Sequence, residues 1–456
     1  MSLLRRTIAA GAAGLLILVC GFTATPANHV DEPVIVTSAP AYDALAGLRG
    51  GERFPKGAQL LRFENGATKP LVPDFAASAD AGVSFDAKKI LFAGRKAAGD
   101  RWAIWELTLA DGSVRKIVDG PTDLICPLYL PEGWLVYARQ TPQGFQMETA
   151  RLDGSHPTRI TFLQNSAVPA DVLADGRILF EAGFPLGIGM DHGAKPEMYL
   201  VYPDGSGVES YRCDHGMARW GGRQLSSGDV VFTHGASLAR FTSPLATEAH
   251  VAAPHAEYAG GIAETLSGAW LLSERAGAAG HYALSLWNPP ETALHPVLSR
   301  TGENLIEPVL VAPRIAPRTH PNALHPWDYA NLLALDARLS RAGDLRTAPT
   351  AVRLEAVDAD GHLITLGTAP VESDGSFFVQ VPGDRTIRFA LLDAKGATLR
   401  EEHGWFWIRK GEQRICVGCH VGPERASENQ VPAVLLRTTI PVNLTGAQLS
   451  AVPGGH

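Results

Sequence analysis

The stretch Asp175-Gly176-Arg177-Ile178-Leu179-Phe180 joins a tight turn to a short apolar strand core. Similar cores recur along the chain: Ile90-Leu91-Phe92, Leu135-Val136-Tyr137, Ile178-Leu179-Phe180, Val230-Val231-Phe232, Trp270-Leu271-Leu272 and Val309-Leu310-Val311. Their starting positions differ by 45, 43, 52, 40 and 39 residues, and turns that contain glycine precede most of them. A period of about forty residues with four strands is typical of a β-propeller blade, because one sheet buries its faces only against neighbouring blades. We therefore predict a mainly β chain with a six- or seven-bladed propeller over residues 40–315.

Two turn sequences inside this region are similar to those of a known class of propeller. Leu152-Asp153-Gly154 and Tyr202-Pro203-Asp204-Gly205-Ser206-Gly207 each precede a strand and the turn of the next blade. In this they resemble the repeats of TolB-like propellers. The resemblance implies a fold and no substrate, because propellers host many functions.

Prolines become frequent over residues 312–350, and there the repeat stops. The β-rich runs beyond this boundary cover residues 351–357, 363–371, 377–381, 387–392 and 405–408. Turns such as Asp360-Gly361 and Asp374-Gly375 connect them, so we predict a small antiparallel β-sandwich over residues 320–412. Residues 413–456 are too few for an independent fold and form a C-terminal segment.

The N-terminus has the features of an export signal. Arg5 and Arg6 precede an apolar run over residues 8–22, and Ala27 fits the small residue expected before a cleavage site. We predict a signal peptide over residues 1–27 and a periplasmic or secreted protein, with a retained membrane anchor as the alternative. The net charge of −7 argues against nucleic acid or an anionic membrane as a partner after cleavage.

Cys416-Val417-Gly418-Cys419-His420 is the attachment pattern of a c-type haem, in which two thiols bond the haem vinyls and the histidine ligates iron. The alternatives are a redox dithiol and half of a zinc site. Neither has its expected surroundings, because no βαβ context is present and the remaining cysteines lie far away in the sequence. We therefore predict one covalent haem c on Cys416, Cys419 and His420. Cys126 and Cys213 either form a disulfide or are separate buried residues.

The sixth iron ligand must come from a distant segment if the protein supplies one. No methionine follows His420, and the four methionines of the mature chain all lie in the predicted propeller. Histidine is then the expected ligand type, because a neighbouring carboxylate can orient its ring. His215, flanked by Asp214 and Gly216, is the first candidate. His192 and His456 are the next.

The C-terminal third resembles the hydrazine synthase alpha-subunit-related proteins. The resemblance is carried by residues 374–382 (Asp-Gly-Ser-Phe-Phe-Val-Gln-Val-Pro), by residues 389–393 (Phe-Ala-Leu-Leu-Asp), and by residues 409–414, which lead into the haem motif. It implies a propeller followed by a middle-domain-like sandwich that binds haem. Hydrazine synthase alpha chains carry two haems c, whereas this sequence has one attachment motif. The resemblance therefore does not imply hydrazine synthesis by this chain alone.

These features favour a periplasmic monohaem c-type cytochrome that binds haem and transfers electrons to a redox partner protein. Other motifs that would indicate catalysis are missing, such as Gly-x-Ser-x-Gly, His-Glu-x-x-His or a phosphate-binding loop. The alternatives are a haem-dependent oxidoreductase acting on a small molecule at an open iron site, and a propeller scaffold with a redox-sensing haem. Two protein ligands on the iron favour electron transfer, whereas an open position favours the alternatives.

Overall fold

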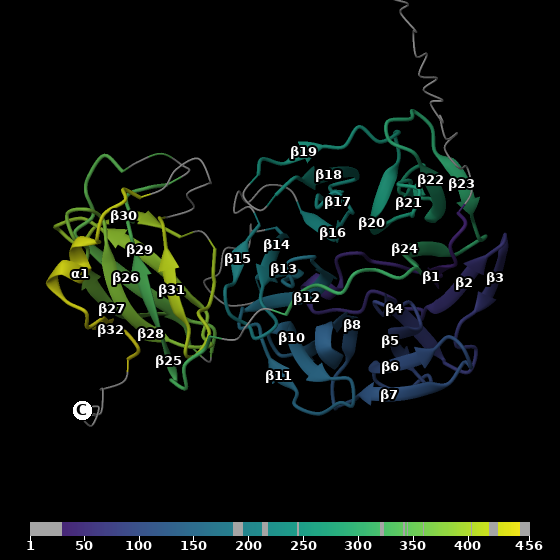
Figure 1. Cartoon of the computed structure of the whole chain (residues 1–456), viewed down its shortest axis with the longest axis horizontal. Helices are drawn as coiled ribbons and strands as arrows, with labels where there is room; N and C mark the ends of the chain where they lie inside the picture. Colours follow the sequence, from purple (N-terminus) through teal and green to yellow (C-terminus); the bar gives the residue numbers. More distant parts are fainter. Residues whose placement is uncertain are drawn as a thin grey trace, which may run out of the picture.

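The computed structural model describes residues 30–185, 195–211, 218–243, 246–319, 323–340, 343, 345–358, 360–402, 404–418 and 427–446. Several residues with predicted roles lie outside this part of the chain: the signal peptide, His192, Cys213, His215, Cys419, His420 and His456. The described chain forms two bodies, a ring of sheets and a smaller sandwich (Figure 1). Among these residues, no helix is long and apolar enough to cross a membrane.

Six four-stranded sheets surround a common axis and form a six-bladed β-propeller (Figure 1). Blade 1 contains β4 (Ala77–Val83), β5 (Lys89–Arg95), β6 (Ala103–Thr108) and β7 (Val114–Val118). Blade 2 contains β8 (Leu124–Leu130), β9 (Trp134–Thr141), β10 (Gly144–Arg151) and β11 (Thr158–Arg159). Blade 3 contains β12 (Asn165–Val172), β13 (Ile178–Pro185), β14 (Glu197–Val201) and β15 (Glu209–Ser210).

The remaining blades follow the same order from the axis outward. Blade 4 contains β16 (Arg219–Gln224), β17 (Val230–His234), β18 (Ser237–Phe241) and β19 (Ala249–His250). Blade 5 contains β20 (Glu257–Glu264), β21 (Trp270–Arg275), β22 (Ala283–Trp287) and β23 (His295–Leu298). Blade 6 contains β24 (Asn304–Leu310), β1 (Val34–Ala39), β2 (Gln59–Glu64) and β3 (Ala67–Pro70). Two short 3₁₀ helices, η1 (Gly47–Arg49) and η2 (Pro131–Gly133), lie in connections.

The last propeller strand closes the ring by pairing with the first. β24 is antiparallel to β1, so blade 6 combines both ends of the propeller sequence. The propeller therefore begins at Val34 rather than near residue 40, and among the described residues it has six blades rather than seven. Five of the apolar cores are second strands, buried on both faces between blades. The sixth core, Val309-Leu310-Val311, lies at the end of inner strand β24, because ring closure places the second strand of that blade at the other end of the propeller sequence.

The sandwich consists of two packed four-stranded sheets. One sheet has the order β31-β25-β28-β32, and its strands are β25 (Tyr329–Ala334), β28 (Phe377–Pro382), β31 (Gln413–Cys416) and β32 (Val442–Asn443). The other has the order β27-β26-β29-β30, and its strands are β26 (Ala351–Val357), β27 (Leu363–Pro370), β29 (Ile387–Leu392) and β30 (Thr398–Glu401). Side chains from both sheets form one apolar core. A short helix, α1 (Ala433–Arg437), precedes β32.

The sandwich differs from its prediction in three respects. The pairs β25–β31 and β28–β32 are parallel, because long connections rather than hairpins bring β31 and β32 to the sheet. Both of these strands lie in the C-terminal segment, so the sandwich extends beyond residue 412. The aromatic run at residues 405–408 forms a single bridge, between Phe406 and Ile387, and not a strand.

Trp407 joins the sandwich to the propeller. Its side chain is completely buried in the apolar cluster between blades 2 and 3, where it contacts Phe162 and Phe180. Its indole N–H donates to the Gly205 carbonyl at 3.0 Å. Arg409 also crosses the interface, since its Nε donates to the Asp204 carbonyl at 2.9 Å. The turn phrase at residues 202–207 is thus one docking point for the sandwich.

Candidate functional site

Cys416 is the last residue of β31, and backbone pairing fixes its position. It lies opposite Ala334 on β25, and the Leu335 N–H donates to the Cys416 carbonyl at 2.8 Å. Along β31, Gln413 and Ile415 are exposed, whereas Cys416 packs against the apolar core of the sandwich. Because side chains alternate along a strand, this register directs the Cys416 thiol inward.

Cys416 and Gly418 line a pocket with an empty volume of about 600 Å³, part of it open to solvent. Apolar side chains from both sheets and from the segment after β30 form most of its walls: Leu332, Ala334, Ala337, Phe377, Phe389, Leu391 and Phe406. A volume of several hundred Å³ with aromatic walls and few polar groups is typical of a cofactor pocket.

Three charged residues at the end of β30 line the same pocket. Arg400 donates from Nη2 to the Gly343 carbonyl at 2.7 Å, while its Nη1 is buried and has no hydrogen-bond partner among the described residues. Glu401 pairs with Arg388. Burial raises the pKa of Glu402 to about 7, against the opposing effects of the Phe389 N–H and of Arg414. Arg400 is thus the member of this group with a buried donor left over.

Burial also raises the pKa of the Cys416 thiol, although the Arg414 guanidinium opposes that shift. The thiol is therefore neutral around pH 7. Arg414 additionally donates to the Val208 carbonyl of blade 3, so the strand that ends at Cys416 contacts the propeller. Val208 precedes Tyr211, after which the described part of blade 3 ends.

The residues of this pocket fit a covalently attached haem. A haem presents a flat apolar ring, vinyl groups that accept thiols, and two carboxylates. The pocket supplies apolar and aromatic walls, a thiol directed inward, and a buried guanidinium nitrogen without a partner. Burial of an unsatisfied donor is unfavourable, and a carboxylate would satisfy it.

The described residues contain one member of the predicted attachment triad. Cys416 lies in the pocket, whereas Cys419 and His420 lie outside the described residues, as do the candidate distal ligands His215, His192 and His456. Cys126 is a free, half-buried cysteine near the propeller axis. Its possible partner Cys213 is also outside the described residues.

Sequence reasoning did not find Arg400 or Glu402 in this pocket. It also missed a group of charged residues at the propeller axis, which includes Arg53, Asp80 and Glu307. No local pattern marks the axial residues, because they come from segments that lie far apart in the sequence. Arg400 had a weak signal, since it lies in an outer strand only a few residues before the aromatic run that leads to Cys416.

The described residues thus define a protein in which a six-bladed β-propeller is followed by a β-sandwich with an apolar pocket. Residues 345–421 match the family model of the hydrazine synthase alpha subunit middle domain. Over these residues the chain is similar to that domain, and the resemblance expected from residues 374–420 is confirmed.

A solved structure has a similar fold over most of this chain. Kuenenia stuttgartiensis hydrazine synthase is similar with a TM-score of 0.75 and 17% identity, over 89% of this chain and 71% of that one. TolB from Acinetobacter baumannii is similar with a TM-score of 0.45 and 15% identity, over 65% of this chain and 69% of that one. A comparison with curated protein sequences finds no match.

Proposed function

We propose that this protein is an exported monohaem c-type cytochrome that transfers electrons, with its haem attached at Cys416 and Cys419 and ligated by His420. The observation that supports this function best is the Cys416 pocket. It combines an inward thiol, apolar walls from two sheets and a buried guanidinium nitrogen that has no hydrogen-bond partner among the described residues. The proposed export rests on the signal pattern over residues 1–27 and suits haem c attachment outside the cytoplasm.

The residues of the chain have distinct parts in this function. The haem iron, when bound, supplies one-electron redox chemistry. The register of β31 holds the Cys416 thiol at the pocket wall, and its raised pKa keeps it neutral. Phe377, Phe389 and Phe406 supply aromatic walls that would pack against the ring. Arg400 offers Nη1 to a carboxylate.

The experiment that tests the attachment uses the full chain, produced with haem c maturation machinery. We expect the denatured wild type to retain a mass increase of one haem after acid-acetone extraction. The double variant Cys416→Ser and Cys419→Ser should lose it completely, because thioether bonds require the thiols. Cys126→Ser is the matched control and should keep the haem. Extraction of haem from the wild type would refute the proposal.

For the distal ligand we propose His215, with low-spin bis-histidine iron. The contact between Arg414 and the Val208 carbonyl supports this, because it brings the strand before the motif to a segment of blade 3 only seven residues before His215. His215→Ala should then convert the iron to a high-spin form that binds carbon monoxide. An unchanged low-spin spectrum would shift the assignment to His192 or His456. A high-spin wild type would favour a haem-dependent oxidoreductase or a redox sensor over electron transfer.

A further inference from the structure

The innermost strand of every blade is irregular at the propeller axis. In each of these six strands the pairing with its neighbour shifts register, and the shifts fall at Asp80, Cys126, Ala170, Gly221, Gly261 and Glu307. Asp80, Cys126 and Glu307 adopt positive φ angles of 59°, 53° and 54°. Such a conformation is unfavourable for residues other than glycine and is concentrated at functional sites. The axis is therefore a place where the fold holds specific side chains in strained positions.

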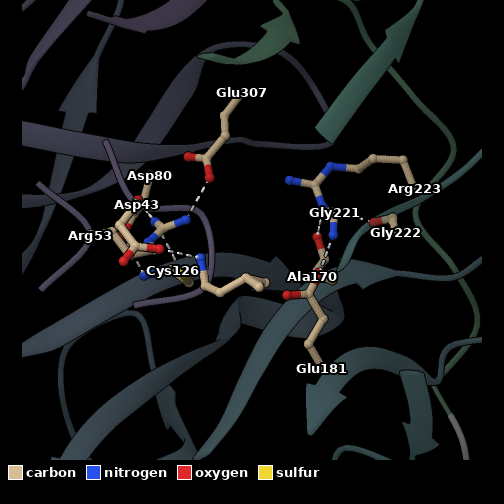
Figure 2. Close-up of polar contacts among 11 residues, drawn as sticks. Asp43, Arg53, Asp80, Cys126, Ala170, Glu181, Gly221, Gly222, Arg223 and Glu307 are labelled. Carbon is tan, nitrogen blue, oxygen red and sulfur yellow. Dashed lines mark hydrogen bonds and ion pairs between the residues drawn. The ribbon is translucent and has the colours of Figure 1, made fainter. Parts of the chain in front are cut away.

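On one side of the axis, Arg53 gathers groups from three blades. Its guanidinium pairs with Asp80 of blade 1 and donates to Glu307 of blade 6 at 2.5 Å, and it lies 3.4 Å from the Cys126 sulfur of blade 2 (Figure 2). All three charged side chains are at most 16% exposed. One guanidinium between two carboxylates leaves this side with an excess negative charge.

On the opposite side of the axis, the balance of positive and negative charge is different. Arg223 of blade 4 donates from Nη1 to the carbonyls of Ala170 and Gly222, and among the described residues it has no ion pair with a carboxylate (Figure 2). Glu181 of blade 3 accepts a hydrogen bond from the Gly221 N–H. Burial raises the pKa of Glu181 to about 7, so it is only partly ionised near neutrality. This side is therefore neutral to positive.

The indole N–H of Trp220 is a further hydrogen-bond donor on this second side of the axis. Trp220 Nε1 is buried and has no hydrogen-bond partner among the described residues, although the residue lines the same pocket as Arg223. A buried donor without a partner is unfavourable by about 1–3 kcal/mol. An acceptor placed in the pocket would satisfy it.

Both sides line one pocket on the propeller axis, with an empty volume of about 620 Å³ that includes space open to solvent. Charges of opposite sign thus face each other across it. We propose that this pocket binds a small zwitterion of the α-amino-acid class. The ligand carboxylate lies toward Arg223 and the Trp220 indole, and its ammonium group lies toward Glu307 and Asp80.

The paired composition of the pocket favours a zwitterion over a simple ion. An anion alone would satisfy Arg223 and Trp220 but would leave the excess negative charge beside Arg53 unbalanced. A cation alone would balance that charge and leave the Trp220 N–H without an acceptor. A ligand that carries both groups would pair with both sides of the pocket. This site is separate from the Cys416 pocket of the sandwich.

Isothermal titration of the mature protein with matched probes tests this site. Glycine and L-alanine should bind at least about tenfold more tightly than acetate or methylamine, which each carry one of the two charges. Arg223→Gln should weaken glycine binding by about tenfold or more. Arg240→Gln is the matched control, because it removes an exposed guanidinium of the same blade that pairs with Asp229.

Each alternative outcome would overturn the proposal. Acetate binding as tightly as glycine would indicate an anion site, and methylamine binding as tightly would indicate a cation site. Absence of glycine binding in the millimolar range would leave the axial charges with a purely structural role. If Arg223→Gln does not fold, Trp220→Phe replaces it, since that variant removes the indole N–H and keeps an aromatic ring. Glycine binding unchanged in Trp220→Phe would contradict the assigned orientation.

Discussion

Both pockets of this molecule are lined largely by residues of β-strands, but the side chains that line them differ in chemical character. The axial pocket is lined by charged side chains that come from different blades and partly neutralise one another. The sandwich pocket is lined mostly by apolar side chains, together with one thiol and three charged residues, one of which, Arg400, has a buried nitrogen without a partner in the described part of the chain. Charged side chains that pair with each other link the segments that carry them. An apolar cavity with an unsatisfied polar atom is instead suited to a large cofactor.

Trp407 connects the two regions, so its removal should have the largest effect. Trp407→Ala deletes a completely buried indole and its hydrogen bond to Gly205, and we expect a loss of about 3–5 kcal/mol in the free energy of unfolding. Denaturant titration measures the loss, and separate transitions should appear as the sandwich uncouples from the propeller. A single transition with unchanged midpoint would mean that Trp407 does not join the two bodies.

The axial charge group should respond strongly to loss of its cation. Arg53→Met leaves Asp80 and Glu307 buried without their partner, which should destabilise the propeller by about 3–5 kcal/mol. Arg49→Met is the control, because the Arg49–Asp43 pair is exposed and should contribute less than about 1 kcal/mol. Equal midpoints for both variants in chemical denaturation would contradict a structural role for the axial pairs.

The carboxyl of Glu181 should make the stability of the propeller depend on pH. Its pKa is raised to about 7 in the folded protein from an ordinary value of 4.5, so the folded state holds the proton more tightly than the unfolded state does. Stability from this group is present below about pH 4.5 and is lost as the pH rises to about 7, by at most about 3 kcal/mol. Glu181→Gln should flatten the stability profile in that window, as measured by denaturation at several pH values. An unchanged profile would show that the carboxyl is already ionised at low pH.

A charge in the sandwich pocket should affect the reduction potential of the proposed haem rather than the stability of the fold. Arg400→Gln removes a positive charge from the Cys416 pocket, so the reduction potential of the attached haem should fall, by about 60 mV if Arg400 contributes about 1.4 kcal/mol. Potentiometric titration measures the change, and mass spectrometry shows that the haem is still attached. Arg437→Gln, at an exposed ion pair with Glu372, is the control. An unchanged reduction potential would show that Arg400 does not contact the haem carboxylates.

The repeat and its strand cores can be predicted from the amino-acid sequence alone. Strands buried between blades on both faces are continuous runs of apolar residues, as in Ile90-Leu91-Phe92, and such runs are visible without a structure. The same holds for most strands of the sandwich, whose turns are marked by Asp-Gly pairs. The predicted haem motif is likewise a local pattern of adjacent residues.

The number of blades and the composition of both pockets depend on contacts that the folded chain makes between distant residues. The ring closes at six because β24 pairs with β1, which is a contact between positions about 270 residues apart. Arg53, Asp80 and Glu307 meet because the connection between β1 and β2 brings Arg53 to the axis, where the bulges of β4 and β24 place Asp80 and Glu307. Arg400 reaches the Cys416 pocket because β30 and β31 belong to facing sheets. Contacts between distant residues leave no periodicity in the sequence, so reading it locally could not reveal them.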